Sequence, residues 1–361
     1  MIASLSFRTF RNYGLLDIDI SDGLTIFEGE NGHGKTNILE GVHVLSTGKL
    51  LRGSKDADAI QFGEHGYSLR GTLLESDSVI EVEAKRGSRK KATFNGMSLR
   101  RVSDLMGRIP SVTFAPEDIE TVRGEPSERR QFVDLALAQV SPAYLTALAG
   151  YKRALEQRNA LLKLSQEHPV GVVQFESWEE ELARFGSEIR VFRRDFLHEI
   201  GEHMRAIHAG IQSNEVLETK YCPHEEAWTL EDFTRAFDES RNREIQRGVT
   251  TVGPHRDDFV MNLNGHDVRT FGSQGQQRSA GISLKLATLV WTRETLDCSP
   301  ILLLDDVFSE LDAGRRERLV DTARKYAGQV ILTCTERAQA GELIDSRSMI
   351  YCVHKGTVRP V

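Results

Sequence analysis

The stretch Gly29-Glu30-Asn31-Gly32-His33-Gly34-Lys35-Thr36 decides the fold, because it fits the phosphate-loop pattern G-x-x-x-x-G-K-[ST]. Residues 24–28 before it are typical of a short buried strand, and apolar residues after it recur at helical spacing. Glycines let the backbone turn its N–H groups toward phosphate oxygens, and the start of the next helix adds partial positive charge. Lys35 is expected to reach the β- and γ-phosphates, and the Thr36 hydroxyl to bind Mg²⁺. We therefore predict that this stretch binds a nucleoside triphosphate.

A second stretch supplies the acidic groups that such a site needs. Residues 301–304 are all apolar and are followed by Asp305 and Asp306. This pattern is typical of a central parallel strand that delivers carboxylates to the carboxyl edge of a sheet. Asp305 suits Mg²⁺ binding together with Thr36, and Asp306 is placed to orient or deprotonate an attacking water. The two stretches together predict an α/β ATPase.

A third stretch, residues 271–279, precedes an amphipathic helix. Ser273, Gly275 and Gln276 offer a hydroxyl, exposed backbone amides and a positive helix end to a second anion. The stretch resembles the signature motif of ABC-type ATPases, and residues 309–312 resemble their D-loop. The resemblance implies a head-to-tail homodimer in which the signature of one subunit faces the ATP of the other. The switch residue of such enzymes is usually His, whereas Thr335 stands near that position here.

Composition restricts the class of protein. The chain has 361 residues, a formal net charge of −7 and 39% hydrophobic residues, which argues against a globally basic nucleic-acid coat but not against a local basic groove. Its cysteines show no C-x-x-C spacing, and no apolar run approaches the ~18 residues of a membrane span. We therefore expect a cytoplasmic protein with no membrane partner.

Cations near two predicted strand ends are candidates for ligand contacts. Arg86, Arg89, Lys90 and Lys91 lie at one end of a predicted hairpin and could hold a DNA backbone through phosphate contacts, although a solvated charge run is an equal alternative. Arg11 could contact the bound nucleotide, and an exposed arginine at a strand end is at least as common.

The middle of the chain predicts long helices. Two amphipathic runs, residues 148–162 and 178–211, should pack as an antiparallel hairpin joined by a short loop. Arg190, Arg193 and Arg194 fall on the polar face, where solvation or contact with a partner is expected. Residues 250–252 read as strand-like. We predict an ABC-type ATPase head with an antiparallel β subdomain and an inserted helical arm, divided as residues 1–125, 126–245 and 246–361.

Over its whole length the sequence resembles the RecF family of DNA-repair ATPases. The resemblance rests on the three stretches above, on residues 116–134 and on Gly253-Pro254-His255-Arg256-Asp257-Asp258. It implies an ATP-dependent DNA-binding protein of recombinational repair that acts with RecO and RecR at gapped DNA, where single strand meets duplex. It also implies help in loading RecA, and slow, DNA-dependent ATP hydrolysis that releases the dimer from DNA.

Three other classes compete with this interpretation. An ATPase subunit that energises a membrane transporter would have its phosphate loop and signature much closer together. A chromosome-organising SMC relative would have a far longer coiled-coil arm. A nuclease would need an additional acidic metal cluster, which the sequence does not offer.

Overall fold

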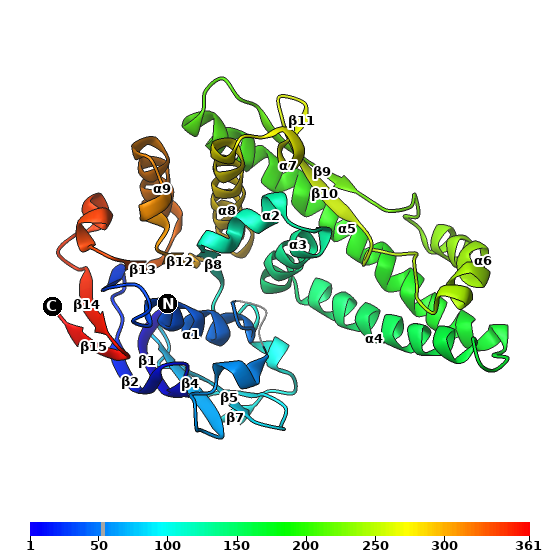
Figure 1. Cartoon of the computed structure of the whole chain (residues 1–361), viewed down its shortest axis with the longest axis horizontal. Coiled ribbons are helices and arrows are strands. Elements are labelled where there is room, and N and C mark those ends of the chain that lie inside the picture. Colours follow the sequence, from blue (N-terminus) through cyan, green and yellow to red (C-terminus); the bar gives the residue numbers. More distant parts are fainter. Residues whose placement is uncertain (52–54) are drawn as a thin grey trace. The chain divides into compact units, whose positions relative to one another are not determined.

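The computed structural model describes residues 1–51 and 55–361 and divides them into two compact units (Figure 1). We call Met1–Asp118 together with Ile282–Val361 the head unit, and Ile119–Gly281 the arm unit. Helix α8 (Gln274–Leu296) begins in the arm unit and continues in the head unit.

The head unit contains a mainly parallel sheet with the strand order β15-β14-β3-β13-β12-β8. Its strands are β3 (Leu24–Glu28), β8 (Ser111–Phe114), β12 (Ile301–Asp305), β13 (Gln329–Cys334), β14 (Met349–His354) and β15 (Thr357–Pro360). Neighbouring strands run parallel except for the antiparallel pair β14–β15. Every residue of β12 and β13 is buried, as expected for parallel strands covered on both faces. The predicted acid-bearing strand is therefore confirmed.

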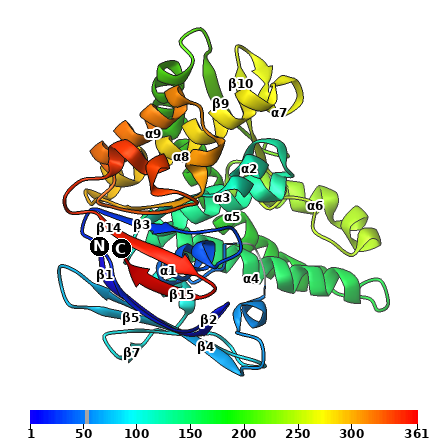
Figure 2. The ribbon, with the colours of Figure 1, turned by 60° about the vertical axis from the view of Figure 1, so that its left-hand side comes forward.

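An antiparallel sheet forms the second layer of the head unit, in the order β2-β1-β4-β5-β6-β7. Its strands are β1 (Ile2–Phe10), β2 (Tyr13–Asp19), β4 (Gly66–Leu73), β5 (Val79–Lys85), β6 (Lys91–Phe94) and β7 (Met97–Ser98). Helix α1 (Lys35–Thr47) lies between this sheet and the parallel one (Figure 2) and buries Ile38, Leu39 and Val42 completely. The antiparallel β subdomain is thus confirmed.

Short elements and α9 complete the head unit. They are η1 (Asp56–Ala59), η2 (Val102–Leu105), η3 (Pro116–Asp118), η4 (Val307–Glu310), α9 (Ala313–Tyr326) and η5 (Arg337–Leu343).

The arm unit is built on a long helical hairpin. Helices α4 (Pro142–Leu164) and α5 (Val172–Ile211) lie side by side (Figure 1). Arg158 of α4 contacts Glu179 near the connecting loop, and Tyr144 contacts Arg193 at the other end, so the predicted antiparallel hairpin is confirmed. The other elements are α2 (Ile119–Arg123), α3 (Pro126–Val140), β9 (Leu217–Cys222), α6 (Leu230–Arg247), β10 (Asp258–Leu263), β11 (His266–Asp267) and α7 (Val268–Phe271).

Two arginines predicted to lie on the solvated face of α5 are buried, and that prediction is wrong for them. Arg190 is fully buried and donates to both carboxylate oxygens of Asp257, at 2.8 and 2.7 Å. Arg193 is buried against Asp134 and the carbonyl of Pro254. Arg194 is exposed, as expected. Helical periodicity treats every arginine as polar and cannot recognise one whose charge is neutralised inside the fold.

The strand expected at residues 250–252 does not form. The backbone N–H of Thr250 donates to the side chain of Asn159, and those of Thr251 and Val252 donate to Glu244. Because side chains have taken these backbone donors, none remains for a strand partner. Strand β9, which sequence reasoning missed, pairs with β10 instead.

Candidate nucleotide site

The phosphate loop follows β3 and is held from both sides by other segments of the head unit. Asn12 donates from Nδ2 to the carbonyl of His33 at 3.0 Å, and the Gly356 N–H donates to the same carbonyl at 3.1 Å. The Tyr13 hydroxyl donates to the Gly34 carbonyl at 3.0 Å. Gly34 has a φ of 109°, and a Cβ there would lie 2.3 Å from Asn12 Nδ2. Only glycine fits this position without strain.

Lys35 begins α1, and its side chain turns back over the loop. Its ammonium donates to the carbonyls of Gly29 at 2.6 Å and Glu30 at 2.9 Å, and lies 3.5 Å from Asn31 Oδ1. Burial lowers the pKa of Lys35, and the negative charges of nearby groups, led by Asp306, oppose this shift. The structure thus holds a cation within the loop, where phosphate charge is expected to bind.

The carboxyl ends of β12 and β13 bring the acids to this loop. Thr36 donates from its hydroxyl to Asp305 Oδ1 at 2.9 Å, so the two predicted magnesium ligands are in contact. Asp306 follows Asp305 in a left-handed conformation, with a φ of 49°. Its Oδ1 is buried and has no hydrogen-bond partner among the residues that the structure describes. A buried, unpaired carboxylate oxygen requires a partner, and a water or ligand at the site would supply one.

Thr333 is a residue of this site that sequence reasoning missed. Its hydroxyl donates to Asp305 Oδ1 at 2.7 Å and accepts the backbone N–H of Asp306 at 3.0 Å. Parallel pairing in the register Asp305↔Thr333 produces both contacts. The available signal was a polar residue directly after three apolar residues of the strand, and Thr333 is fully buried.

Arg11, the predicted nucleotide contact, and its neighbour Asn12 have different partners in the structure. The Arg11 guanidinium binds the buried carboxylate of Glu40, at 2.7 and 2.9 Å, and the carbonyl of Asp58. Its neighbour Asn12 makes the contact with the phosphate loop and is itself fixed by Asn37 at 2.8 Å. Arg11 therefore precedes a residue that contacts the loop, and its own contact with a nucleotide stays a prediction.

The signature-like residues lie in the arm unit, at the start of α8. Ser273 and Gln276 cap the helix reciprocally: the Ser273 N–H donates to Gln276 Oε1 at 2.9 Å, and the Gln276 N–H donates to Ser273 Oγ at 3.3 Å. Ser273 is exposed, and Gly275 lies within the first turn. The prediction that this cluster opens a helix is confirmed, whereas its role in anion binding stays a prediction.

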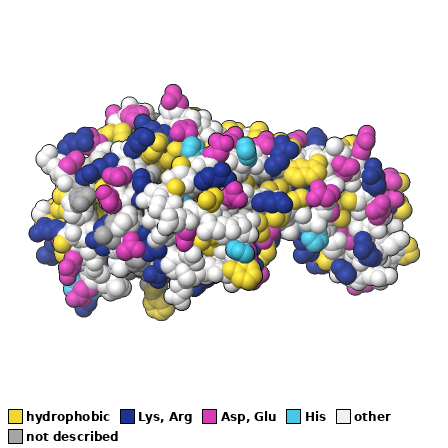
Figure 3. Space-filling model, turned by 90° about the horizontal axis from the view of Figure 1, so that it is seen from above, with side chains coloured by type: hydrophobic (Ala, Val, Ile, Leu, Met, Phe, Trp, Pro, Cys, Tyr) yellow, Lys and Arg dark blue, Asp and Glu magenta, His cyan; other side chains and the backbone are white. Residues whose placement is uncertain are grey.

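The predicted DNA cations differ from one another in their surroundings. Lys90 forms an ion pair with Asp56, and its side chain is only 12% exposed, while Arg86 donates to the Glu64 carbonyl. Arg89 and Lys91 are exposed. On the face of the molecule drawn in Figure 3, Lys and Arg side chains are interspersed with Asp and Glu side chains.

The phosphate loop follows β3, and the two adjacent acids stand at the carboxyl end of β12, with the single strand β13 between β3 and β12. These are the two halves of a nucleotide site at one edge of a parallel sheet. The glycine-rich loop, Lys35 and the Asp306 oxygen that has no partner among the described residues fit a nucleoside triphosphate. Together with the helix-opening Ser273 cluster, they define the chain as an ABC-type ATPase head with an inserted helical arm.

Comparison with known proteins identifies the family. The model of the RecF/RecN/SMC N-terminal domain matches residues 1–359. The DNA replication and repair protein RecF of Heliobacterium modesticaldum is 39% identical, over 98% of this chain and 98% of that protein. RecF of Acetivibrio thermocellus is 38% identical, over 94% of each. The chain therefore belongs to the RecF family of DNA replication and repair proteins.

Solved structures agree with this assignment. A structure of the recombination mediator protein RecF with ATP, in the RecFOR pathway, is 31% identical with a TM-score of 0.91, and the match covers 100% of this chain and 97% of that chain. The Smc head domain of Pyrococcus furiosus, at 17% identity and a TM-score of 0.57 over 100% and 95%, shares the fold. In the part of the chain that the structure describes, none of the helices combines the length and apolarity of a membrane span.

Proposed function

We propose that this protein is an ATP-gated, DNA-binding homodimer of recombinational repair. ATP closes two subunits on DNA near a junction of single strand and duplex, and slow, DNA-dependent hydrolysis to ADP and phosphate releases them. Membership of the RecF family supports this proposal over a transporter subunit. The site residues support the ATP-dependent part, and the DNA footprint on Arg86, Arg89, Lys90 and Lys91 is part of the proposal.

Residues of the head unit bind the phosphates and the metal and activate the attacking water. The backbone of residues 29–34 and the Lys35 ammonium bind and orient the phosphates, and Arg11 is a further candidate contact for the nucleotide. Thr36 and Asp305 would hold Mg²⁺, which supplies charge neutralisation at the β- and γ-phosphates. Asp306 orients the attacking water and accepts its proton, a role supported by its buried oxygen without a partner in the described residues.

The remaining contacts come from a second subunit. Ser273, Gly275 and Gln276 present a hydroxyl and the start of α8 to the γ-phosphate bound by the partner. Because both faces of such an interface need the negative charge of the nucleotide, the dimer depends on ATP. RecO and RecR are the proposed protein partners, and loading of RecA onto gapped DNA is the proposed outcome.

The observation that carries the proposal is the contact of Thr36 with Asp305 beside the unpaired Asp306 oxygen. It assigns nucleotide and metal binding to one set of residues and water activation to Asp306. Two variants test this assignment. Lys35→Met should lose ATP binding, dimerisation and tight DNA binding together. Asp306→Asn should keep the phosphate and metal ligands, lose water activation and accumulate as an ATP-bound dimer. Light scattering after gel filtration, with and without ATP and Mg²⁺, measures both outcomes.

Ser273→Arg provides a matched control that removes pairing between subunits but not nucleotide binding. It should bind nucleotide as the wild type does but remain monomeric, because the substitution places a bulky cation at the pairing face. A monomeric Asp306→Asn variant would contradict the proposal. So would a wild-type chain that binds DNA equally well with and without ATP.

A further inference from the structure

Glu215 links the end of the long helix α5 to the signature-like residues of α8. It lies between α5 and β9, and its side chain is 18% exposed. Its Oε1 accepts a hydrogen bond from Gln276 Nε2 at 2.8 Å, and its Oε2 lies 3.1 Å from Nε2 of the fully buried His208. Residues of the arm unit therefore form a chain of contacts from His208 through Glu215 to Gln276, and from there to Ser273.

The chemistry of these groups fixes which way the Gln276 amide points. An ionised carboxylate only accepts hydrogen bonds, so the NH₂ group of Gln276 must face Glu215. The amide oxygen is thereby directed to the Ser273 N–H, which it binds at 2.9 Å. If the amide were reversed, two donors would meet at Ser273 and two acceptors at Glu215. Glu215 thus selects the one amide orientation that caps the start of α8.

We propose that Glu215 is a positioning residue for the signature motif, acting through Gln276 on the backbone around Ser273. This inference rests on the proposed function, in which Ser273 pairs with the nucleotide of a second subunit. A motif held in its binding geometry before association loses less conformational entropy when it binds. Glu215 therefore strengthens ATP-dependent pairing while leaving the nucleotide affinity of a single subunit unchanged, because the phosphate loop belongs to the head unit.

A graded set of substitutions in the Asp306→Asn background tests the proposal. Glu215→Gln keeps an acceptor for Gln276 and should pair within about twofold of the unsubstituted protein. Glu215→Ala removes the acceptor and should weaken ATP-dependent dimerisation by about tenfold, the equivalent of one net hydrogen bond. Glu215→Lys places a donor opposite Gln276, reverses the amide and should weaken dimerisation more than alanine does.

Two measurements separate positioning from simple support of the fold. Sedimentation at a series of protein concentrations with ATP gives the dimer dissociation constant, and a fluorescent ATP analogue at nanomolar protein gives the affinity of the monomer. The latter should stay within about twofold in every variant. In addition, Glu215→Ala should have little further effect when Gln276 is already alanine, because the two residues act as one unit.

Glu218→Ala is the matched control, since Glu218 lies nearby on β9 and pairs with Arg205 at the surface. It should dimerise as the unsubstituted protein does. Unchanged dimerisation of Glu215→Ala, or equal losses in dimerisation and monomer nucleotide affinity, overturns the inference while leaving the proposed function intact. If the unsubstituted protein and Glu218→Ala also fail to dimerise with ATP, the proposed function itself fails and the inference falls with it.

Discussion

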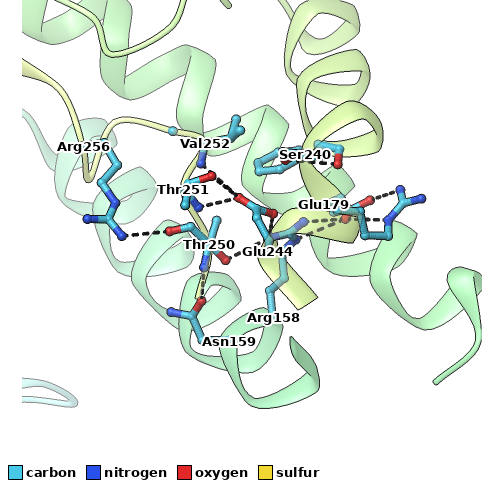
Figure 4. Close-up of polar contacts among 12 residues, drawn as sticks. Arg158, Asn159, Glu179, Ser240, Glu244, Thr250, Thr251, Val252 and Arg256 are labelled. Carbon is cyan, nitrogen blue, oxygen red and sulfur yellow. Dashed lines mark hydrogen bonds and ion pairs between the residues drawn. The ribbon is translucent and has the colours of Figure 1, made fainter. Parts of the chain in front are cut away.

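Arg158→Met should destabilise the arm unit severely, because it removes a fully buried cation that pairs with two buried carboxylates (Figure 4). The Arg158 guanidinium donates to Glu179 from Nε at 3.1 Å and from Nη2 at 2.8 Å, and to the Thr250 hydroxyl at 2.9 Å. It also forms a 2.6 Å ion pair with Glu244, and it lies 4.9 Å from the Phe237 ring centroid. Methionine fills much of the volume of the arginine stem but replaces none of these polar contacts.

The size of the loss in free energy of unfolding depends on which hydrogen bonds Glu179 and Glu244 keep in the variant. Glu179 retains Arg241, which donates to both of its oxygens. Glu244 retains hydrogen bonds from Thr251 and Val252 but loses the cation that pairs with its fully buried side chain. Removing one partner of a buried pair costs about 3 to 5 kcal/mol, and the surviving contacts favour the lower end, about 3 kcal/mol.

The loss of stability caused by Arg158→Met should be smaller in acid than at neutral pH. Burial is the largest influence on the pKa of Glu244 and raises it, but Arg158 and the hydrogen bonds from Thr251 outweigh burial, so the net pKa is lowered. In the wild type this group therefore stabilises the fold above its unfolded pKa of about 4.3, and the stabilisation is lost as pH falls through the folded value. Without Arg158, the largest influence that lowers this pKa is lost, so the folded pKa of Glu244 rises from its wild-type value. The difference in stability between wild type and variant should consequently be largest near pH 7 and shrink in acid.

Urea unfolding followed by tryptophan fluorescence measures this difference. The chain has three tryptophans, of which Trp178 and Trp228 lie in the arm unit, so a Trp291→Phe background reports that unit alone. Arg205→Met is the matched control, because Arg205 forms an exposed ion pair, and it should change the free energy of unfolding by no more than about 0.5 kcal/mol. A loss below about 1 kcal/mol for Arg158→Met, or a difference that grows in acid, would refute the reasoning.

Two further predictions concern the nucleotide site and the DNA footprint. Thr333→Val removes the hydrogen bonds of the Thr333 hydroxyl with the Asp305 carboxylate and the Asp306 backbone N–H. It should slow ATP hydrolysis by about tenfold to a hundredfold, whereas Thr333→Ser keeps the hydroxyl and should keep most of the rate. Steady-state phosphate release distinguishes the two variants. Neutralising the exposed Arg89 and Lys91 should lower the slope of log K against log salt for DNA binding by about 0.9 for each lost phosphate contact, and neutralising Lys90, which is paired with Asp56, should lower it less. A slope that stays unchanged after Arg86, Arg89, Lys90 and Lys91 are all neutralised would place the footprint elsewhere.

Local sequence patterns were sufficient to predict the strands, loop and helices that carry the site. The phosphate loop, the buried strand that ends in Asp305 and the helix that opens after Ser273 each follow from residues within a few positions of one another. Glycine conformation, apolar runs and helix caps are local properties, and the structure has these elements where the sequence placed them. The antiparallel hairpin of α4 and α5 was predictable for the same reason.

Contacts that depend on strand register and on charge neutralisation could not be predicted in this way. Thr333 meets Asp305 only because β12 and β13 pair in one parallel register. Arg190 and Arg193 are buried because carboxylates distant in the sequence neutralise them, although helical periodicity placed both on a polar face. Glu215 reaches Gln276 across 61 positions of the chain. Sequence by itself determined which chemical groups this protein carries and the elements that bear them, since these depend on neighbouring residues. The tertiary structure decided which groups meet, because a buried polar or charged group is stable only beside a partner that the folded chain brings to it.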